Sequence, residues 1–268
     1  MRRTLSLTVA VLAVVALVGP ACSSSNKTDS GAAATTTSVA GQATGTITVS
    51  AASSLTGAFG TIKTDFVKAH PGSTVDITFD SSARLVDQIE SGAPADVAAF
   101  ADTTTMKKLA DKNLLAGPSQ IFATNQLVIV TKPGNPKNIK TLADLAHAGT
   151  IALCASTAPC GKYAEKVLSD AGVTIPTSSI TRGENAKATL SAVANGDADA
   201  GIVYVTDGKA AGSTVSTVTI PPAQNAVAQY PIAVVKGTKN PTLAQSFMAY
   251  VLGPEGQAVL KEAGFGAP

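Results

Sequence analysis

The sequence has no tryptophan, only 4% aromatic residues and only 14% charged residues among its 268 positions. Platforms that stack nucleic-acid bases or sugar rings need aromatic side chains, so this scarcity argues against both kinds of ligand. Apart from Arg2 and Arg3 near the N-terminus, 18 basic residues face 18 acidic ones. Nucleic-acid binding needs a positively charged surface, which this balance does not provide, so we expect no nucleic-acid partner.

Histidine and cysteine are also rare, with two and three copies respectively. His70 and His147 are the only imidazoles, and neither a Gly-x-Ser-x-Gly nor a His-Glu-x-x-His motif is present. We therefore expect no enzyme, no protein-ligated metal and no cofactor. Hydrophobic residues make up 45% of the chain, which is enough to bury a large core and excludes a wholly disordered protein.

The N-terminus has the pattern of an export signal. Two arginines precede an apolar run from Leu5 to Val18, which is shorter than the roughly 20 residues of a spanning helix. Gly-Pro-Ala before Cys22 resembles the lipobox of bacterial lipoproteins, so we expect a signal peptide over 1–21 and a lipidated Cys22; cleavage that leaves a free Cys22 is the alternative. Residues 22–45 are rich in Ser, Thr, Ala and Gly and predict a flexible tether. The expected product is exported and lipid-anchored to the outer face of the cytoplasmic membrane.

The two remaining cysteines, Cys154 and Cys160, lie close together in the sequence. An exported protein meets an oxidising compartment, which favours a disulfide between them. A metal pair is the alternative, although only His70 and His147 could complete it.

From Thr46 onward, strand-like and helix-like patterns alternate, which predicts an α/β fold with mainly parallel sheets flanked by helices. Expected strands cover 46–53, 75–80, 97–100, 126–132, 150–154, 200–205, 215–220 and 230–236, and a helix is expected over 141–149. The pattern divides into two sets, and we expect two lobes joined by a hinge that the chain crosses twice. Lobe 1 would hold 46–125 plus 230–268, and lobe 2 would hold 126–229, with a ligand cleft between them.

Several expected helices begin directly after a strand, with Ser53-Ser54, Ser81-Ser82, Cys160-Gly161 and Asn185-Ala186 at their starts. A helix N-terminus offers unpaired N–H groups and partial positive charge, which together bind anions. The alternatives are structural: Ser54 and Ser82 as ordinary N-caps, and Tyr204 as a core ring with a satisfied hydroxyl.

Five segments carry a resemblance to a known family: ITVSAASSLTGAF (47–59), TFDSSARLVDQIESGAPADV (78–97), PCGKYAEKVL (159–168), GIVYVTDG (201–208) and YPIAVVKG (230–237). In this order they resemble the periplasmic molybdate-binding proteins, the solute-binding components of molybdate ABC transporters. The resemblance covers residues 46–268 and implies a two-lobed periplasmic-binding-protein fold.

The resemblance also implies a function and a site. The function would be capture of molybdate or tungstate by a monomer, for delivery to an ABC permease in the membrane. The oxyanion would be held by Ser54 and Ser82 from one lobe, and by Cys160, Ala186 and Tyr204 from the other. Ser54 and Ser82 would each donate from a hydroxyl and a backbone N–H group, Tyr204 from its hydroxyl, and Cys160 and Ala186 from backbone N–H groups.

Asp80, before the serine pair, departs from the pattern of the family. A carboxylate in the cleft could accept a proton from hydrogen phosphate, so a phosphate- or sulfate-binding lipoprotein is the rival function. Strand alternation places Asp80 on the opposite face from Phe79, and we expect it to be a solvated strand end.

Overall fold

The structure is a computed structural model that describes residues 44–268. The predicted signal peptide, Cys22 and nearly all of the predicted tether lie outside the described residues. No helix within the described range is long and apolar enough to cross a membrane.

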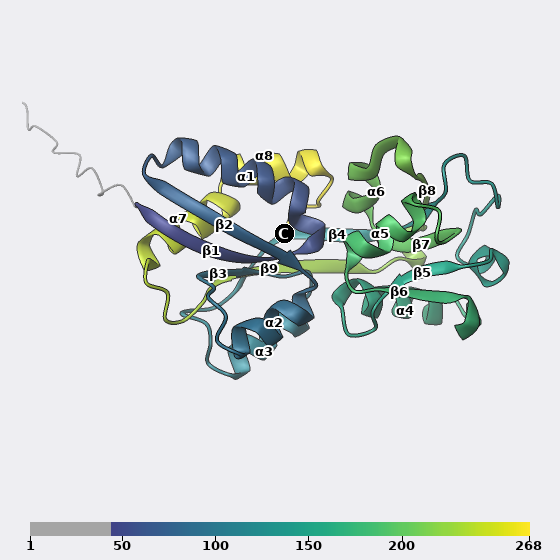
Figure 1. Cartoon of the computed structure of the whole chain (residues 1–268), viewed down its shortest axis with the longest axis horizontal. Coiled ribbons are helices and arrows are strands. Elements are labelled where there is room, and N and C mark those ends of the chain that lie inside the picture. The colour runs from purple at the N-terminus through teal and green to yellow at the C-terminus, as the bar shows by residue number, and fades with distance from the viewer. Residues whose placement is uncertain (1–43) are drawn as a thin grey trace, which may run out of the picture. The chain divides into compact units, whose positions relative to one another are not determined.

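Two groups of elements follow each other along the described chain (Figure 1). The first group contains β1 (Gly45–Ala52), α1 (Thr56–Ala69), β2 (Ser73–Asp80), α2 (Ser82–Glu90), β3 (Val97–Ala99) and α3 (Thr103–Asp111). The second group contains β5 (Ile151–Cys154), α4 (Pro159–Asp170), β6 (Ile180–Gly183), α5 (Ala186–Ala194), β7 (Ala200–Tyr204), α6 (Val205–Ala211) and β8 (Ser216–Thr219). After the second group, α7 (Pro241–Leu252) and α8 (Pro254–Ala263) return to pack beside α1.

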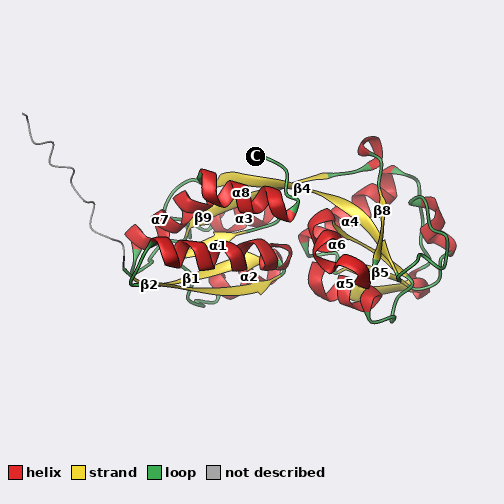
Figure 2. Cartoon of the chain, turned by 90° about the horizontal axis from the view of Figure 1, so that it is seen from above, coloured by secondary structure: helices red, strands yellow, loops and turns green. Residues whose placement is uncertain are grey.

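Two long strands, β4 (Gln120–Thr131) and β9 (Val227–Val234), connect the groups (Figure 2). The first half of β4 pairs with β9, and its second half pairs with β7 and β8. Strand β9 pairs in turn with β3, so the strand order is β2-β1-β3-β9-β4-β7-β5-β6. All antiparallel pairs involve β4 or β9, and the pairs β1–β2, β1–β3, β5–β6 and β5–β7 are parallel.

The pairing of β4 with β9 contains a β-bulge. Ile121 pairs with Pro231, but the next pair joins Ala123 to Tyr230, so Phe122 is an extra residue on β4. Proline lacks an N–H donor and is tolerated where a ladder is interrupted in this way.

Hydrophobic clusters cover both faces of the sheet formed by the strands of the first group. Val97 and Ala99 of β3 join a cluster that includes Phe59 of α1, whereas Ala98 joins a cluster with Leu85 of α2. Successive strand residues point to opposite faces, so this alternation places α1 on one face and α2 on the other. Figure 1 shows the same arrangement, with α1, α7 and α8 on one side of the strands and α2 and α3 on the other.

The predicted fold class is confirmed, and the differences are local. Strands β4 and β9 begin six and three residues earlier than predicted, and the helix predicted over 141–149 is a short 3-10 helix, Ala143–His147. Strand β6 was not predicted because Ile180–Gly183 has no apolar run. Helix α6 was also missed because it follows β7 without a loop.

Candidate functional site

A small cavity lies where β1, β2 and α2 of the first group meet α4, α5 and β7 of the second. It contains about 190 Å³ of empty space, including the part open to solvent. Even with that part counted, the space is too small for an organic ligand and is on the scale of a small ion. All five residues expected at the oxyanion site line it. The lining consists of Ala52, Ser53, Ser54, Asp80, Ser81, Ser82, Ala101, Pro159, Cys160, Ala186 and Tyr204.

Ser54 reaches the cavity from a 3-10 helix, Ser53–Leu55, that joins β1 to α1. It is buried and does not cap either helix, because Ala52 and Leu55 occupy the N-cap positions without side-chain bonds. The N-cap alternative is therefore wrong for Ser54. Its hydroxyl lies 2.8 Å from the hydroxyl of Tyr230 in β9.

Ser82 is the first residue of α2, and its side chain is fully buried. Ser81 is the N-cap, and its hydroxyl accepts a hydrogen bond from the backbone N–H of Arg84. The N-cap alternative is therefore also wrong for Ser82. The Ser82 oxygen accepts a 3.0 Å bond from the N–H of Ala101, so its own proton is free to point into the cavity.

Cys160 is the second residue of α4 and is bonded to Cys154, the last residue of β5, with an S–S distance of 2.07 Å. The metal alternative is wrong because neither sulfur is a free thiolate. Gly161 holds the same turn close to β5: a Cβ there would lie 2.1 Å from the carbonyl oxygen of Ala155. Pro159 has no N–H, and the N–H of Gly161 donates to the carbonyl of Ala158 at 3.0 Å, so the N–H of Cys160 is the main-chain donor that this turn can offer to the cavity.

Ala186 is the first residue of α5 and is buried at the cavity wall. Asn185 caps this helix by accepting from the N–H of Ala188. The N–H at the first position of a helix is one of those without an intrahelical partner. Ala186 thus adds a main-chain donor, and its methyl group adds no charge.

Tyr204 ends β7 with its side chain only 1% exposed. Its hydroxyl is one of two buried side-chain polar atoms without a hydrogen-bond partner in the described part of the chain. The alternative of a satisfied core hydroxyl is therefore wrong. Burial raises the pKa of the phenol well above its ordinary value, so the group stays protonated and is a donor.

Asp80 lines the cavity and is not the solvated strand end that the sequence suggested. One carboxylate oxygen accepts from the N–H of Ser81 at 2.7 Å and from the side-chain amide of Asn185 at 3.1 Å. The other oxygen lies 3.3 Å from Nε of Arg84, which also pairs with Glu184. Asp80 and Arg84 belong to the first group, and Glu184 and Asn185 to the second, so this cluster joins the groups at the rim of the cavity.

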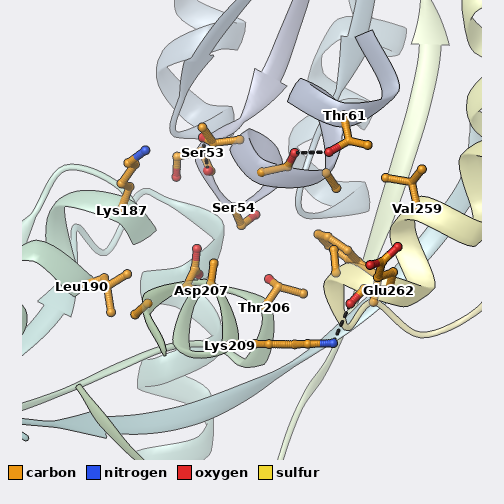
Figure 3. Close-up of a pocket in the computed structure, with 17 residues that line it drawn as sticks. Ser53, Ser54, Thr61, Lys187, Leu190, Thr206, Asp207, Lys209, Val259 and Glu262 are labelled. Carbon is orange, nitrogen blue, oxygen red and sulfur yellow. Dashed lines mark hydrogen bonds between the residues drawn. The ribbon is translucent and has the colours of Figure 1, made fainter. Parts of the chain in front are cut away.

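A second and larger cavity adjoins the first and shares Ser53 and Ser54 with it (Figure 3). It lies between the ends of α1 and α8 and the helices α5 and α6. Asp207 of α6 points into it, and burial raises the pKa of this carboxyl to about 7. The carboxylate oxygen accepts from the backbone N–H of Tyr204 at 3.2 Å, which fixes the end of β7.

The sequence did not indicate Asn125, Tyr230 or Thr206 near the site. Asn125 donates to Thr206 at 2.8 Å and to the hydroxyl of Tyr230 at 3.4 Å, and all three are buried. The only signal in the sequence is a polar residue within the apolar run of β4. His70 and His147 line neither cavity.

Comparison with known proteins assigns the chain to a family. Residues 47–266 match the family described as bacterial extracellular solute-binding protein. The molybdate-binding protein ModA of Mycobacterium tuberculosis is 37% identical over 261 residues, covering 97% of this chain and 96% of that protein. ModA of Escherichia coli is 34% identical, with 82% and 89% covered.

Solved structures agree with the sequence relatives. The periplasmic molybdate-binding protein of Azotobacter vinelandii superimposes with a TM-score of 0.76 at 25% identity, covering 83% of this chain and 99% of that one. The sulfate-binding protein SubI of M. tuberculosis has a TM-score of 0.74 at 20% identity, with 82% and 86% covered, and therefore shares the fold. The chain belongs to the bacterial extracellular solute-binding proteins, within the family of molybdate-binding proteins of ABC transporters.

Proposed function

We propose that this protein captures molybdate, and tungstate equally well, outside the cytoplasmic membrane and delivers it to an ABC permease. The observation that carries the proposal is the set of donors around the small cavity. Ser54, Ser82 and Tyr204 line it and would donate from their hydroxyls, and Cys160 and Ala186 lie at helix starts on its wall. The proposal also draws on the names of the relatives, which bind molybdate.

Neutral donors are sufficient for a dianion. A buried ion without partners would be unfavourable by many kcal/mol. Hydrogen bonds to a charged group return roughly 1.5–3 kcal/mol each, so six or seven donors offset the loss of hydration. The N-termini of α2, α4 and α5 add their positive ends to the same cavity.

Size and protonation would select the ion. Molybdate and tungstate are nearly equal in size, whereas sulfate and phosphate are smaller and would leave some donors unpaired. Hydrogen phosphate also needs an acceptor for its proton. Asp80 is a weak acceptor for this proton because Ser81, Asn185 and Arg84 already take three of the roughly four acceptor positions of its carboxylate. These contacts make phosphate the weaker candidate.

Binding would bring two lobes together. We assign 46–125 plus 230–268 to lobe 1 and 126–229 to lobe 2, with β4 and β9 as the connecting strands. Polar contacts beside the cavity would stabilise the closed form: Asn185 bonds Asp80, and Lys162 lies 3.1 Å from Asp102. Only a closed, loaded protein would present both lobes correctly to the permease.

The anchoring step belongs to the same proposal. Cys22 would carry lipid and the tether would let the monomer reach the permease. A relative from Bacillus subtilis, 29% identical over 225 residues, is named as a putative substrate-binding lipoprotein, which supports this part.

Calorimetric titration of residues 44–268 with four anions tests the proposal. We expect tight binding of molybdate and tungstate within about tenfold of each other, and sulfate and phosphate at least about a hundredfold weaker. A double Ser54→Ala, Ser82→Ala variant is the control for the site and should lose most of the affinity. Tighter binding of sulfate or phosphate than of molybdate by the natural sequence would reject the assignment.

A further inference from the structure

We propose that Asn125 and Tyr230 are positioning residues that orient the proton of Ser54 toward the anion, so that the site discriminates against anions that carry a proton. The inference rests on the proposed function, since it assumes that the small cavity holds the oxyanion. It adds two residues that lie on the connecting strands β4 and β9 and line neither cavity.

The orientation of the Asn125 amide is fixed by a backbone group. The N–H of Gln126 donates to Oδ1 of Asn125 at 2.9 Å, and an N–H can only donate. Oδ1 therefore faces Gln126, and Nδ2 faces Thr206 at 2.8 Å and the Tyr230 hydroxyl at 3.4 Å. The side-chain nitrogen has two protons and no acceptor capacity, so Tyr230 must accept from it.

This amide determines the direction of the remaining bond. Tyr230 cannot donate to Nδ2, so the hydroxyl of Ser54, at 2.8 Å, is the one acceptor within hydrogen-bond distance of its proton among the described residues. Tyr230 therefore donates and Ser54 accepts. Burial raises the pKa of Tyr230, so the phenol keeps its proton at every pH at which the protein works.

The consequence lies at the cavity. Ser54 accepts from Tyr230, and its own proton has no other hydrogen-bond partner among the described residues. That proton is therefore available to an anion in the cavity. Ser82 is held in the same way, because the N–H of Ala101 donates to its oxygen. Both serines thus present protons inward, and a fully ionised tetrahedral anion accepts from both.

A protonated anion meets the opposite situation. One of its oxygens is a donor, and Ser54, Ser82 and Tyr204 all offer protons in return. The Asp80 carboxylate lines the same cavity but already accepts from Ser81 and Asn185 and pairs with Arg84, so it is a weak acceptor for that proton. Two donors that face each other leave one bond unmade in a buried place, which is costly. The chain of hydrogen bonds from Asn125 through Tyr230 to Ser54 therefore contributes to selectivity as well as to affinity.

The test compares two anions of similar size and equal charge. At about pH 8.5 sulfate and hydrogen phosphate are both dianions, and only hydrogen phosphate carries a proton. Both affinities are measured by displacement of bound molybdate from the described chain. Tyr230→Phe keeps the ring but frees Ser54. We expect molybdate and sulfate to bind roughly three- to tenfold more weakly, and the preference for sulfate over phosphate to fall by a similar factor.

Asn125→Asp reverses the direction of the hydrogen bonds that join residue 125, Tyr230 and Ser54. The carboxylate accepts from Tyr230, Ser54 then donates to Tyr230, and an acceptor faces the cavity. The added charge repels both anions equally, so the preference for sulfate should fall further than in Tyr230→Phe. Where phosphate binds the natural protein too weakly to measure, measurable binding by Asn125→Asp is the supporting result. Tyr250→Phe, on α7, is the matched control and should leave the preference unchanged.

The inference is overturned if both anions weaken by the same factor in Tyr230→Phe and Asn125→Asp, because that pattern indicates a structural effect only. It is equally overturned if neither variant gains phosphate binding relative to sulfate. If Asn125→Asp does not fold, the result for Tyr230→Phe decides. Failure of the natural protein to bind molybdate would instead reject the proposed function itself, whatever the variants do.

Discussion

The two walls of the small cavity offer hydrogen bonds by different means. On the wall from the first group the side-chain donors are the hydroxyls of Ser54 and Ser82, and each hydroxyl has a hydrogen-bond partner in the protein. On the wall from the second group, Cys160 and Ala186 offer main-chain N–H groups at helix starts, and Tyr204 adds a hydroxyl without a partner. The hydroxyl donors on the first wall depend on the identity of the side chain, whereas the donors on the second wall depend mostly on the position of the backbone.

This difference decides which substitutions can affect the site. A serine hydroxyl is removed by one substitution, whereas a main-chain donor survives any substitution that preserves the backbone. Cys160 illustrates the second case: its side chain is committed to the disulfide, and its N–H remains. The following predictions test the contrast, beginning with the largest expected effect.

Ala186→Pro should weaken molybdate binding by about a hundredfold, because it removes one donor and places a ring carbon at the wall. Proline is favoured at the first helical position, and the extended backbone of Asn185 (φ −152°, ψ 176°) is what a following proline requires. Calorimetry measures the affinity, and thermal melting checks the fold.

Ala186→Gly is the matched control, since it keeps the N–H and adds no group. Its affinity should stay within about threefold of the natural protein. Unchanged binding by Ala186→Pro would show that the main chain of α5 does not contact the anion.

Tyr204→Phe and Ser82→Ala should each weaken molybdate binding by about tenfold but differ in stability. The Tyr204 hydroxyl has no protein partner, so its loss should leave the melting temperature of the empty protein unchanged or higher. Loss of the Ser82 hydroxyl leaves the buried N–H of Ala101 unpaired, which should lower the free energy of unfolding by about 1–3 kcal/mol. Chemical denaturation without ligand separates the two.

Equal stability changes in these two variants would contradict the assignment of partners on the two walls. Ser53→Ala is a suitable comparison, because Ser53 lines the cavity but is not an expected donor. It should change affinity by less than about threefold.

The last prediction concerns the pH dependence of stability. Burial raises the pKa of Asp207 to about 7, above its ordinary value of 3.8, so the folded chain keeps a proton that the unfolded chain has released. The protonated carboxyl therefore favours the folded chain. Its contribution to the free energy of unfolding is complete below about pH 4 and is lost as the pH rises through about 7. Asp207→Asn should remove that dependence and raise the free energy of unfolding at pH 8 by about 1–3 kcal/mol relative to the natural protein.

Denaturant unfolding at several pH values measures this effect. Asp199→Asn is an unsuitable control because Asp199 is paired with Lys132. Asp76→Asn, which changes an exposed carboxyl on β2 that has no ion pair among the described residues, should shift stability little and without the same pH profile. Parallel profiles for the natural protein and Asp207→Asn would contradict the raised pKa.

Local pattern accounts for most of the fold. Alternating strands, helical spacing and the glycine and proline breaks placed β1, α1, β7 and the closing helices near their observed positions. The pattern failed where tertiary pairing replaces local preference, as in β6, whose Ile180–Gly183 contains Arg182 and lies beside β5. It also failed for the early starts of β4 and β9, which depend on their pairing with each other.

The candidate site was predictable only in part. Ser54, Ser82, Cys160, Ala186 and Tyr204 were expected from the family resemblance and from helix starts, and the structure brings them to one cavity. The partners of these residues were not predictable. Asn125 and Tyr230 lie 105 residues apart, and no sequence spacing relates them.

The bulge in β4 has a consequence for the residues beyond it. Side chains alternate along a strand, so one extra residue exchanges the two faces of everything that follows. Asn125 therefore shares a face with Tyr230 because Phe122 interrupts the ladder. A ladder that paired Phe122 itself with Tyr230 would turn the Asn125 amide away from the phenol, whereas deleting Phe122 would restore regular pairing and leave the amide on the same face. One irregular point in the pairing of β4 with β9 thus determines which face of the sheet carries the contact between Asn125 and Tyr230. In our proposal, the choice of ion depends on this contact.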